Sequence, residues 1–256
     1  MGFRPIRFIR FKMATYIAAR GLAGWLIFNG LGWGALAVFF SVFCSNVAIY
    51  GYNLITDIRE DRANNRALPE RGGWLVVGTA VALGLAASAT LGGAAPWFWS
   101  VLLVIGLLYS RLRVKDIFPL KNIYIAFGGA WFFLFGASPH LQFTPEMVAG
   151  YLIFAAVAVI VSLVADLRDI AGDAVNGVKS LPVVLGREVS EMIAYGVIAA
   201  VSIMVAAMQL AVFYPIAVMA VPASYHLGRR AYVKSQSFMI IAAALVPGIL
   251  MVLELV

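Results

Sequence analysis

The long apolar run over residues 33–55 ends in the stretch Asn53-Leu-Ile-Thr-Asp57-Ile-Arg-Glu-Asp61-Arg-Ala-Asn64-Asn-Arg66. Asn53, Asp57 and Asp61 are spaced i, i+4, i+8, and this spacing keeps three side chains on one face of a helix. Ionised carboxylates at the end of a membrane helix are costly unless something neutralises them. The stretch therefore predicts a polar site at the end of a membrane-spanning helix.

A second acidic stretch, Asp166-Leu-Arg-Asp169-Ile-Ala-Gly-Asp173, also follows an apolar run, and its spacing of i, i+3, i+7 again gives one helical face. Two such faces suggest a shared cation. Mg²⁺ is a hard cation that binds carboxylates together with the phosphate oxygens of a substrate. Arginine and lysine side chains nearby would neutralise the remaining phosphate charge. We infer an isoprenyl diphosphate substrate, whose apolar chain would lie among the helices.

The composition places the chain in a membrane. Of the 256 residues, 63% are hydrophobic and only 12% are charged, which is more apolar surface than a soluble domain of this size can bury. The apolar runs approach or exceed the roughly 20 residues that a helix needs to cross a bilayer. A membrane β-barrel would instead show short alternating segments. We therefore expect an all-α polytopic membrane protein.

Breaks in the apolar pattern predict nine transmembrane helices. All but one of the 19 basic residues fall in the N-terminal flank or in loops on the N-terminal side of the membrane, and Arg20 is the exception. Positive loops stay in the cytoplasm, so we predict a cytoplasmic N-terminus, with both acidic stretches on that side. The same bias accounts for the net charge of +7 without a nucleic-acid partner. The predicted spans cover residues 14–30, 33–55, 74–93, 96–110, 121–138, 146–166, 190–208, 210–227 and 237–255.

Three motifs give the chain a family resemblance. The first is Asn53-x-x-x-Asp57-x-x-x-Asp61 with the continuation Asn64-Asn-Arg66-Ala-Leu-Pro69. The second is Asp166-x-x-Asp169-x-x-x-Asp173 followed by Gly177-Val-Lys179-Ser-Leu-Pro182, and the third is Tyr109-Ser110 followed by Arg113 and Lys115. In these motifs the chain resembles the UbiA superfamily of intramembrane prenyltransferases. The resemblance implies one domain over residues 1–256, with nine transmembrane helices around a central cavity that opens at the cytoplasmic face.

The resemblance also implies an activity and a set of site residues. The reaction would be the Mg²⁺-dependent transfer of an isoprenyl group from a polyprenyl diphosphate to a lipophilic acceptor within the membrane. Tyr109 would face the allylic carbocation through its ring, although an aromatic anchor at the membrane interface is an equal alternative. The expected metal ligands are Asp57, Asp61, Asp169 and Asp173 with support from Asp166, and the expected diphosphate contacts are Asn53, Arg66, Arg113, Lys115 and Lys179.

Three other activities are alternatives to this one. The second acidic stretch lacks the Gly and Ala-Arg positions of CDP-alcohol phosphotransferases, which excludes that class. A transporter is disfavoured because the polar residues gather at one face rather than at the midplane. A terpene cyclase of the same superfamily, which closes the prenyl chain without an acceptor, stays open. The prenyl length, the acceptor and the oligomeric state are also left open.

Overall fold

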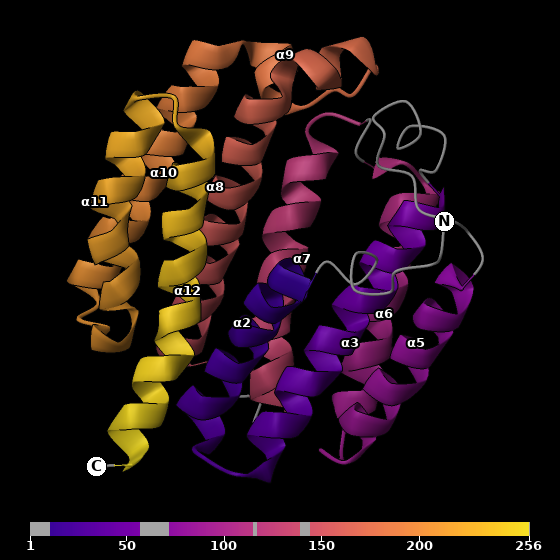
Figure 1. Cartoon of the computed structure of the whole chain (residues 1–256). Coiled ribbons are helices and arrows are strands. Elements are labelled where there is room, and N and C mark those ends of the chain that lie inside the picture. The colour runs from indigo at the N-terminus through magenta and orange to yellow at the C-terminus, as the bar shows by residue number, and fades with distance from the viewer. Residues whose placement is uncertain (1–10, 57–71, 115–116, 139–143, 256) are drawn as a thin grey trace. The chain divides into compact units, whose positions relative to one another are not determined.

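The computed structural model describes residues 11–56, 72–114, 117–138 and 144–255 (Figure 1). Every regular element in these ranges is a helix. In chain order the helices are α2 (Phe11–Asn29), α3 (Trp33–Thr56), α5 (Gly73–Ala89), α6 (Ala95–Arg111), α7 (Leu120–Ala137), α8 (Pro145–Val175), α9 (Leu181–Leu185), α10 (Arg187–Ala207), the 3₁₀ helix η3 (Ala211–Phe213), α11 (Tyr214–Gly228) and α12 (Tyr232–Leu255).

Each of the nine predicted spans coincides with helix in the structure, and the predicted all-α class is confirmed. Within the described ranges, six helical segments are long and apolar enough to cross a membrane. Two further apolar helices, α5 and α6, are shorter. The count of nine spans and the cavity at the cytoplasmic face stay predictions.

The chain divides into two compact units. The first unit falls within Met1–Val114 and Leu134–Leu141, and the second falls within Lys115–Phe133 and Gln142–Val256. The last turn of α7 therefore belongs to the first unit, while the rest of that helix belongs to the second. That the two units act as one domain stays a prediction.

Helix α3 is the centre of the first unit, where it packs against α2, α5 and α6 (Figure 1). The buried indole of Trp99 in α6 donates a hydrogen bond to the carbonyl of Ser41 in α3, at 2.9 Å. Gly84 in α5 leaves room for that ring, since a Cβ atom there would lie 2.3 Å from it. Small residues at contacts are typical of membrane helices, which associate by close packing rather than by a hydrophobic driving force.

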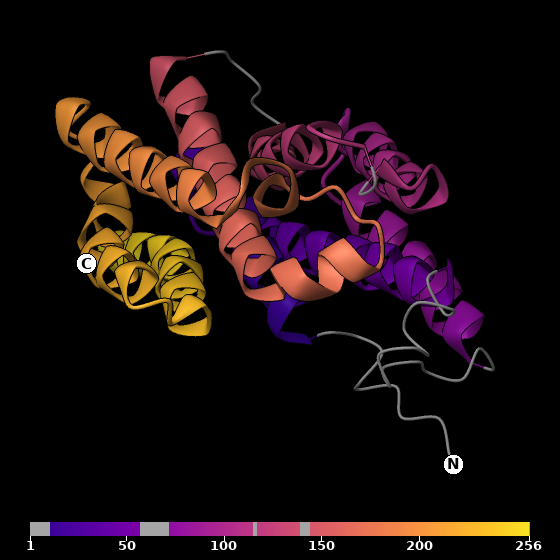
Figure 2. The ribbon, with the colours of Figure 1, turned by 90° about the horizontal axis from the view of Figure 1, so that it is seen from above.

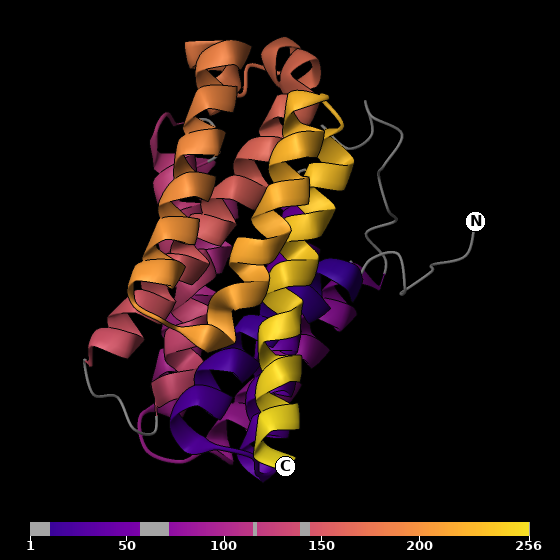
Figure 3. The ribbon, with the colours of Figure 1, turned by 90° about the vertical axis from the view of Figure 1, so that its left-hand side faces the viewer.

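Helix α8 is the centre of the second unit, where it packs against α10, α12 and the short α9. Figure 3 shows α10, α11 and α12 running side by side. In the core, the ring of Phe154 lies between those of Phe133 and Phe213, with centroid distances of 5.3 and 5.8 Å. The side-chain amide of Gln236 in α12 donates to the carbonyl of Val161 at 3.0 Å. The contact with Gln236 holds α8 at Val161, five residues before Asp166.

Candidate active site

Defined caps set both ends of the helix that carries the second acidic stretch. At the start of α8, the Thr144 hydroxyl accepts a hydrogen bond from the Met147 amide, and Pro145 occupies the first turn. At its end, Gly177 has a φ of +71°, and the amide of Val178 donates to the carbonyl of Asp173 at 2.9 Å. This is the glycine-terminated end that many helices use. These two ends place all three aspartates inside α8.

Helix α8 is long, and those aspartates lie near its C-terminal end. Its 31 residues give a length of about 46 Å, whereas the hydrocarbon core of a bilayer is about 30 Å thick. After Gly177, the chain turns into α9, which runs across this end of α8 (Figure 2). The prediction that Asp166, Asp169 and Asp173 share a helix is confirmed. In helical projection, Asp173 lies about 20° from Asp166 and Asp169 about 60° from it.

Asp166 is neutralised inside the second unit. The Nζ atom of Lys121, in the first turn of α7, lies 2.6 Å from Oδ1 of Asp166. The two side chains are only 13% and 8% exposed. Oδ2 of Asp166 is buried and makes no hydrogen bond within the described part of the chain. The carboxylate therefore has one oxygen held by an ammonium group and one oxygen available to a further ligand.

Asp169 has a different environment. Its two carboxylate oxygens accept hydrogen bonds from Nε and a terminal nitrogen of Arg168, at 2.8 and 2.7 Å. Both side chains of this pair are more than 40% exposed. Because the pair is open to solvent and formed by sequence neighbours, it holds Asp169 far less firmly than Lys121 holds Asp166.

Asp173 completes the set, with Lys179 beyond it. Oδ2 of Asp173 is buried and has no hydrogen-bond partner among the described residues. Lys179 is exposed between Val178 and Ser180, which are both buried. Buried polar atoms in native proteins usually have a hydrogen-bond partner, so these oxygens of Asp166 and Asp173 are candidate ligand-binding atoms.

These oxygens suit a hard divalent cation such as Mg²⁺, which prefers carboxylate and phosphate oxygens. One helix cannot supply the whole coordination shell, since Asp166 and Asp173 are about 10 Å apart along the axis. Consistently, no three His, Cys, Asp or Glu side chains in the described ranges converge closely enough to hold a metal. A metal bound at Asp169 or Asp173 would need further oxygens from a substrate, from water or from another segment.

The remaining predicted site residues belong to the first unit or lie outside the described residues. Asn53 lies in the last turn of α3, where its carbonyl accepts a hydrogen bond from the Thr56 hydroxyl at 3.1 Å. Tyr109 lies in the last turn of α6 and is partly buried. Arg113 follows this helix in the left-handed conformation, with a φ of +52°. The other predicted ligands, Asp57, Asp61, Arg66 and Lys115, lie outside the described residues.

Lys121 is the site residue that the sequence analysis did not single out. In the sequence it is a basic residue at the start of the predicted fifth span. A lysine in the first turn of an apolar helix is a usable signal, because its charge needs a partner or water there. The sequence could not say which aspartate provides that partner, since the two residues are 45 positions apart.

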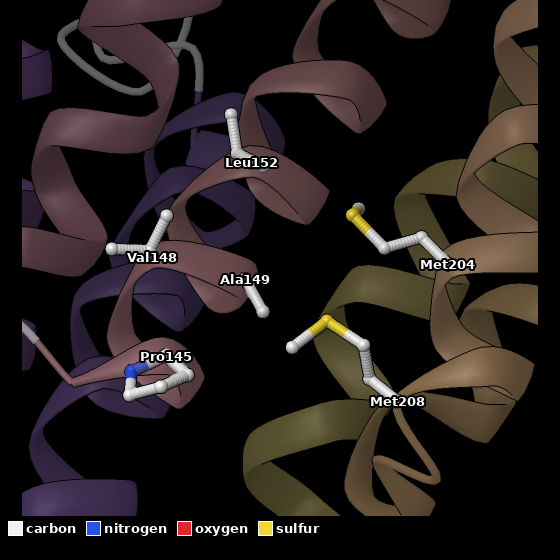
Figure 4. Close-up of a pocket in the computed structure, with 6 residues that line it drawn as sticks. All are labelled: Pro145, Val148, Ala149, Leu152, Met204 and Met208. Atoms are coloured by element: carbon white, nitrogen blue, oxygen red, sulfur yellow. The ribbon is translucent and has the colours of Figure 1, made fainter.

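The second unit also contains an apolar hollow at the opposite end of α8. It has a volume of about 400 Å³ and is lined by four residues of α8, by Met204 of α10 and by Met208, which follows α10. Figure 4 shows the side chains of Met204 and Met208 projecting toward α8. No charged side chain lines this hollow. The other four lining residues are Pro145, Val148, Ala149 and Leu152.

Solved structures with the same fold cover nearly the whole chain. A UbiA homologue from Aeropyrum pernix K1, in its apo form, matches with a TM-score of 0.81 and 18% identity, over 96% of this chain and 99% of that one. A UbiA homologue from Archaeoglobus fulgidus bound to GPP and Mg²⁺ matches with a TM-score of 0.76 and 17% identity, over 97% and 99%. A structure described as digeranylgeranylglyceryl phosphate synthase in membranes matches with a TM-score of 0.70 and 24% identity, over 97% and 96%.

Sequence comparison gives the family directly. A search of curated proteins found no match. The family model described as the UbiA prenyltransferase family matches residues 12–244, which include all three motifs recognised in the sequence. The chain is therefore an integral membrane protein that belongs to the UbiA prenyltransferase family.

Proposed function

We propose that the protein is a Mg²⁺-dependent membrane prenyltransferase that transfers an isoprenyl group from a polyprenyl diphosphate to a lipophilic acceptor. The observation that carries the proposal is the C-terminal end of α8. There, at the end of an apolar helix, buried carboxylate oxygens of Asp166 and Asp173 make no hydrogen bond with any described residue. A prenyl diphosphate matches this environment. Its metal-bound diphosphate suits the carboxylates, and its apolar tail suits the apolar helix.

The carboxylates of both acidic stretches would hold the metal. We assign Asp169 and Asp173 as ligands together with Asp57 and Asp61, with Asp166 in support. When bound, Mg²⁺ supplies positive charge that stabilises diphosphate as a leaving group. The proposed diphosphate contacts are Asn53, Arg66, Arg113, Lys115 and Lys179.

The reaction forms an allylic carbocation that must be protected from water. The bond between C1 of the prenyl chain and the diphosphate oxygen breaks, and the electron pair leaves with the diphosphate. A nucleophilic atom of the acceptor then bonds to C1 and loses a proton. The chain contributes apolar helices that exclude water from the allylic cation, and Tyr109 contributes a ring face that stabilises its charge.

Two comparisons support this chemistry. Homologous structures from Archaeoglobus fulgidus are bound to GPP or DMAPP together with Mg²⁺. The similar synthase structure is named for a digeranylgeranylglyceryl phosphate product, which favours transfer to an acceptor over cyclisation. The positive loops favour a cytoplasmic N-terminus, and the active site would then face the cytoplasm.

The direct test uses the purified full-length protein in nanodiscs. Geranylgeranyl diphosphate is added with Mg²⁺ or with EDTA, and with or without a lipid extract as the source of acceptor. We expect diphosphate release that needs both Mg²⁺ and the extract. A hydrocarbon product formed without the extract would instead assign a terpene cyclase. Absence of diphosphate release with prenyl donors of ten to twenty carbons would overturn the proposal.

A further inference from the structure

Lys121 forms a buried ion pair with Asp166 at the edge of the proposed metal site. Lys121 comes from α7 and Asp166 from α8, and both lie in the second unit. Asp166 precedes Asp169 by about 4.5 Å along the helix axis. A charge at this position acts on anything bound at Asp169 or Asp173, and burial limits its screening by solvent.

We propose that Lys121 is a positioning residue that makes metal binding depend on diphosphate. This inference rests on the proposed function. The ammonium group holds Oδ1 of Asp166 at 2.6 Å and repels a divalent cation bound beside it. The same ammonium group attracts the anionic diphosphate. Mg²⁺ alone would therefore bind weakly, and Mg²⁺ together with diphosphate would bind well.

Lys121 and Arg168 differ in how far they are exposed to solvent. Arg168 is 42% exposed, and water and salt screen its charge. Lys121 is 13% exposed, and its partner Asp166 is 8% exposed. Removing the positive charge of Lys121 therefore affects a nearby bound ligand more than removing that of Arg168. Oδ2 of Asp166 makes no hydrogen bond within the described ranges, so the lysine leaves this carboxylate oxygen able to bind the metal.

The proposal predicts opposite changes in two binding constants. In Lys121→Met, the affinity for Mn²⁺ alone should rise about tenfold, because a repelling charge is gone. The affinity for inorganic diphosphate at saturating Mg²⁺ should fall by a similar factor of about ten. Asp166→Asn should show the mirror pattern, with weaker Mn²⁺ binding and tighter diphosphate binding. Lys121→Arg keeps the charge and should keep both constants near those of the wild type.

The measurement uses the full-length protein in nanodiscs, with Mn²⁺ followed by electron paramagnetic resonance and diphosphate by calorimetry. Lys234→Met is the matched control, since Lys234 is an exposed lysine of the same unit, and it should leave both constants unchanged. If Lys121→Met does not fold, Asp166→Asn and Lys121→Arg still test the prediction.

The outcomes separate two kinds of failure. Opposite shifts in Lys121→Met, or the mirror shifts in Asp166→Asn, support the role of Lys121. Parallel weakening of both ligands, or no change in either, would overturn it and leave an ion pair that only stabilises the fold. If the wild-type protein itself binds neither Mn²⁺ nor diphosphate, the proposed function fails, and this inference fails with it.

Discussion

Asp166 and Asp169 lie three residues apart on α8, and each forms an ion pair. The two pairs differ in where their basic partners lie and in how far they are buried. Lys121 and Asp166 come from different helices and are buried, whereas Arg168 and Asp169 are sequence neighbours and are open to solvent. Breaking a buried pair leaves a charge that neither water nor a partner compensates. Breaking an exposed pair leaves two hydrated charges at little cost. One helical face can thus hold a fixed carboxylate and an exchangeable one.

This difference indicates that the three aspartates of α8 have different roles. Asp166 is already engaged and contributes structure and charge. Asp169 can give up Arg168 in favour of a metal without a large penalty, and Asp173 has a buried oxygen that no described residue hydrogen-bonds.

The largest effect is expected at the exchangeable carboxylate. Asp169→Ala should lower turnover of the prenyl diphosphate by about 10²- to 10³-fold or more, because a group that stabilises the leaving diphosphate is lost. Protein yield and melting temperature should change little, since the side chain is exposed. Glu188→Ala, at an exposed acidic residue of α10, is the control and should retain full turnover. Wild-type turnover in Asp169→Ala would refute the metal assignment.

The next effect concerns stability. Lys121→Met should lower the free energy of unfolding by about 3–5 kcal/mol, because Asp166 is left buried and uncompensated. Denaturant titration of the protein in detergent micelles measures this value. The double variant Lys121→Met with Asp166→Leu should recover most of the loss, since an apolar pair can replace a buried ion pair. A double variant as unstable as the single one contradicts the explanation.

A smaller effect is expected where α8 ends. Gly177→Ala should cost about 1 kcal/mol, because alanine is strained at a φ of +71° although nothing obstructs its Cβ atom. The matched control is Gly172→Ala, inside α8 and also unobstructed, which should stabilise the helix by about 0.5–1 kcal/mol. Opposite signs in thermal melting support the assigned end of α8. Equal signs would place the end of the helix elsewhere.

The smallest effect is expected at the exposed pair. Arg168→Met should change the free energy of unfolding by less than about 1 kcal/mol, as is usual for solvent-exposed ion pairs. Its effect should also shrink as salt is added, whereas the effect of Lys121→Met should persist. A loss as large as that at Lys121 would mean that the two pairs are equivalent.

The sequence predicted the parts of this account that depend on spacing. The apolar runs and their breaks predicted helices at all nine positions, because hydrophobic length and turn residues are local properties. The interval between Asp166 and Asp173 predicted one helical face for the same reason. The motifs predicted the family.

The partner of each carboxylate could not be predicted, because it depends on contacts between distant segments. Lys121 reaches Asp166 across 45 positions, and Trp99 reaches Ser41 across 58. Spacing also could not show that two neighbouring aspartates differ in burial. That Asp57 and Asp61 share a metal with α8 stays a prediction, since these residues lie outside the described part of the chain.

The central claim is that the carboxylates of α8 hold a divalent metal together with a diphosphate. Electron–nuclear double resonance of the full-length protein with Mn²⁺ and inorganic diphosphate tests it directly. We predict a coupling between protein-bound Mn²⁺ and the ³¹P nuclei of diphosphate in the wild type, and its loss in Asp169→Ala combined with Asp173→Ala. An unchanged coupling in that double variant would place the metal elsewhere and contradict the claim.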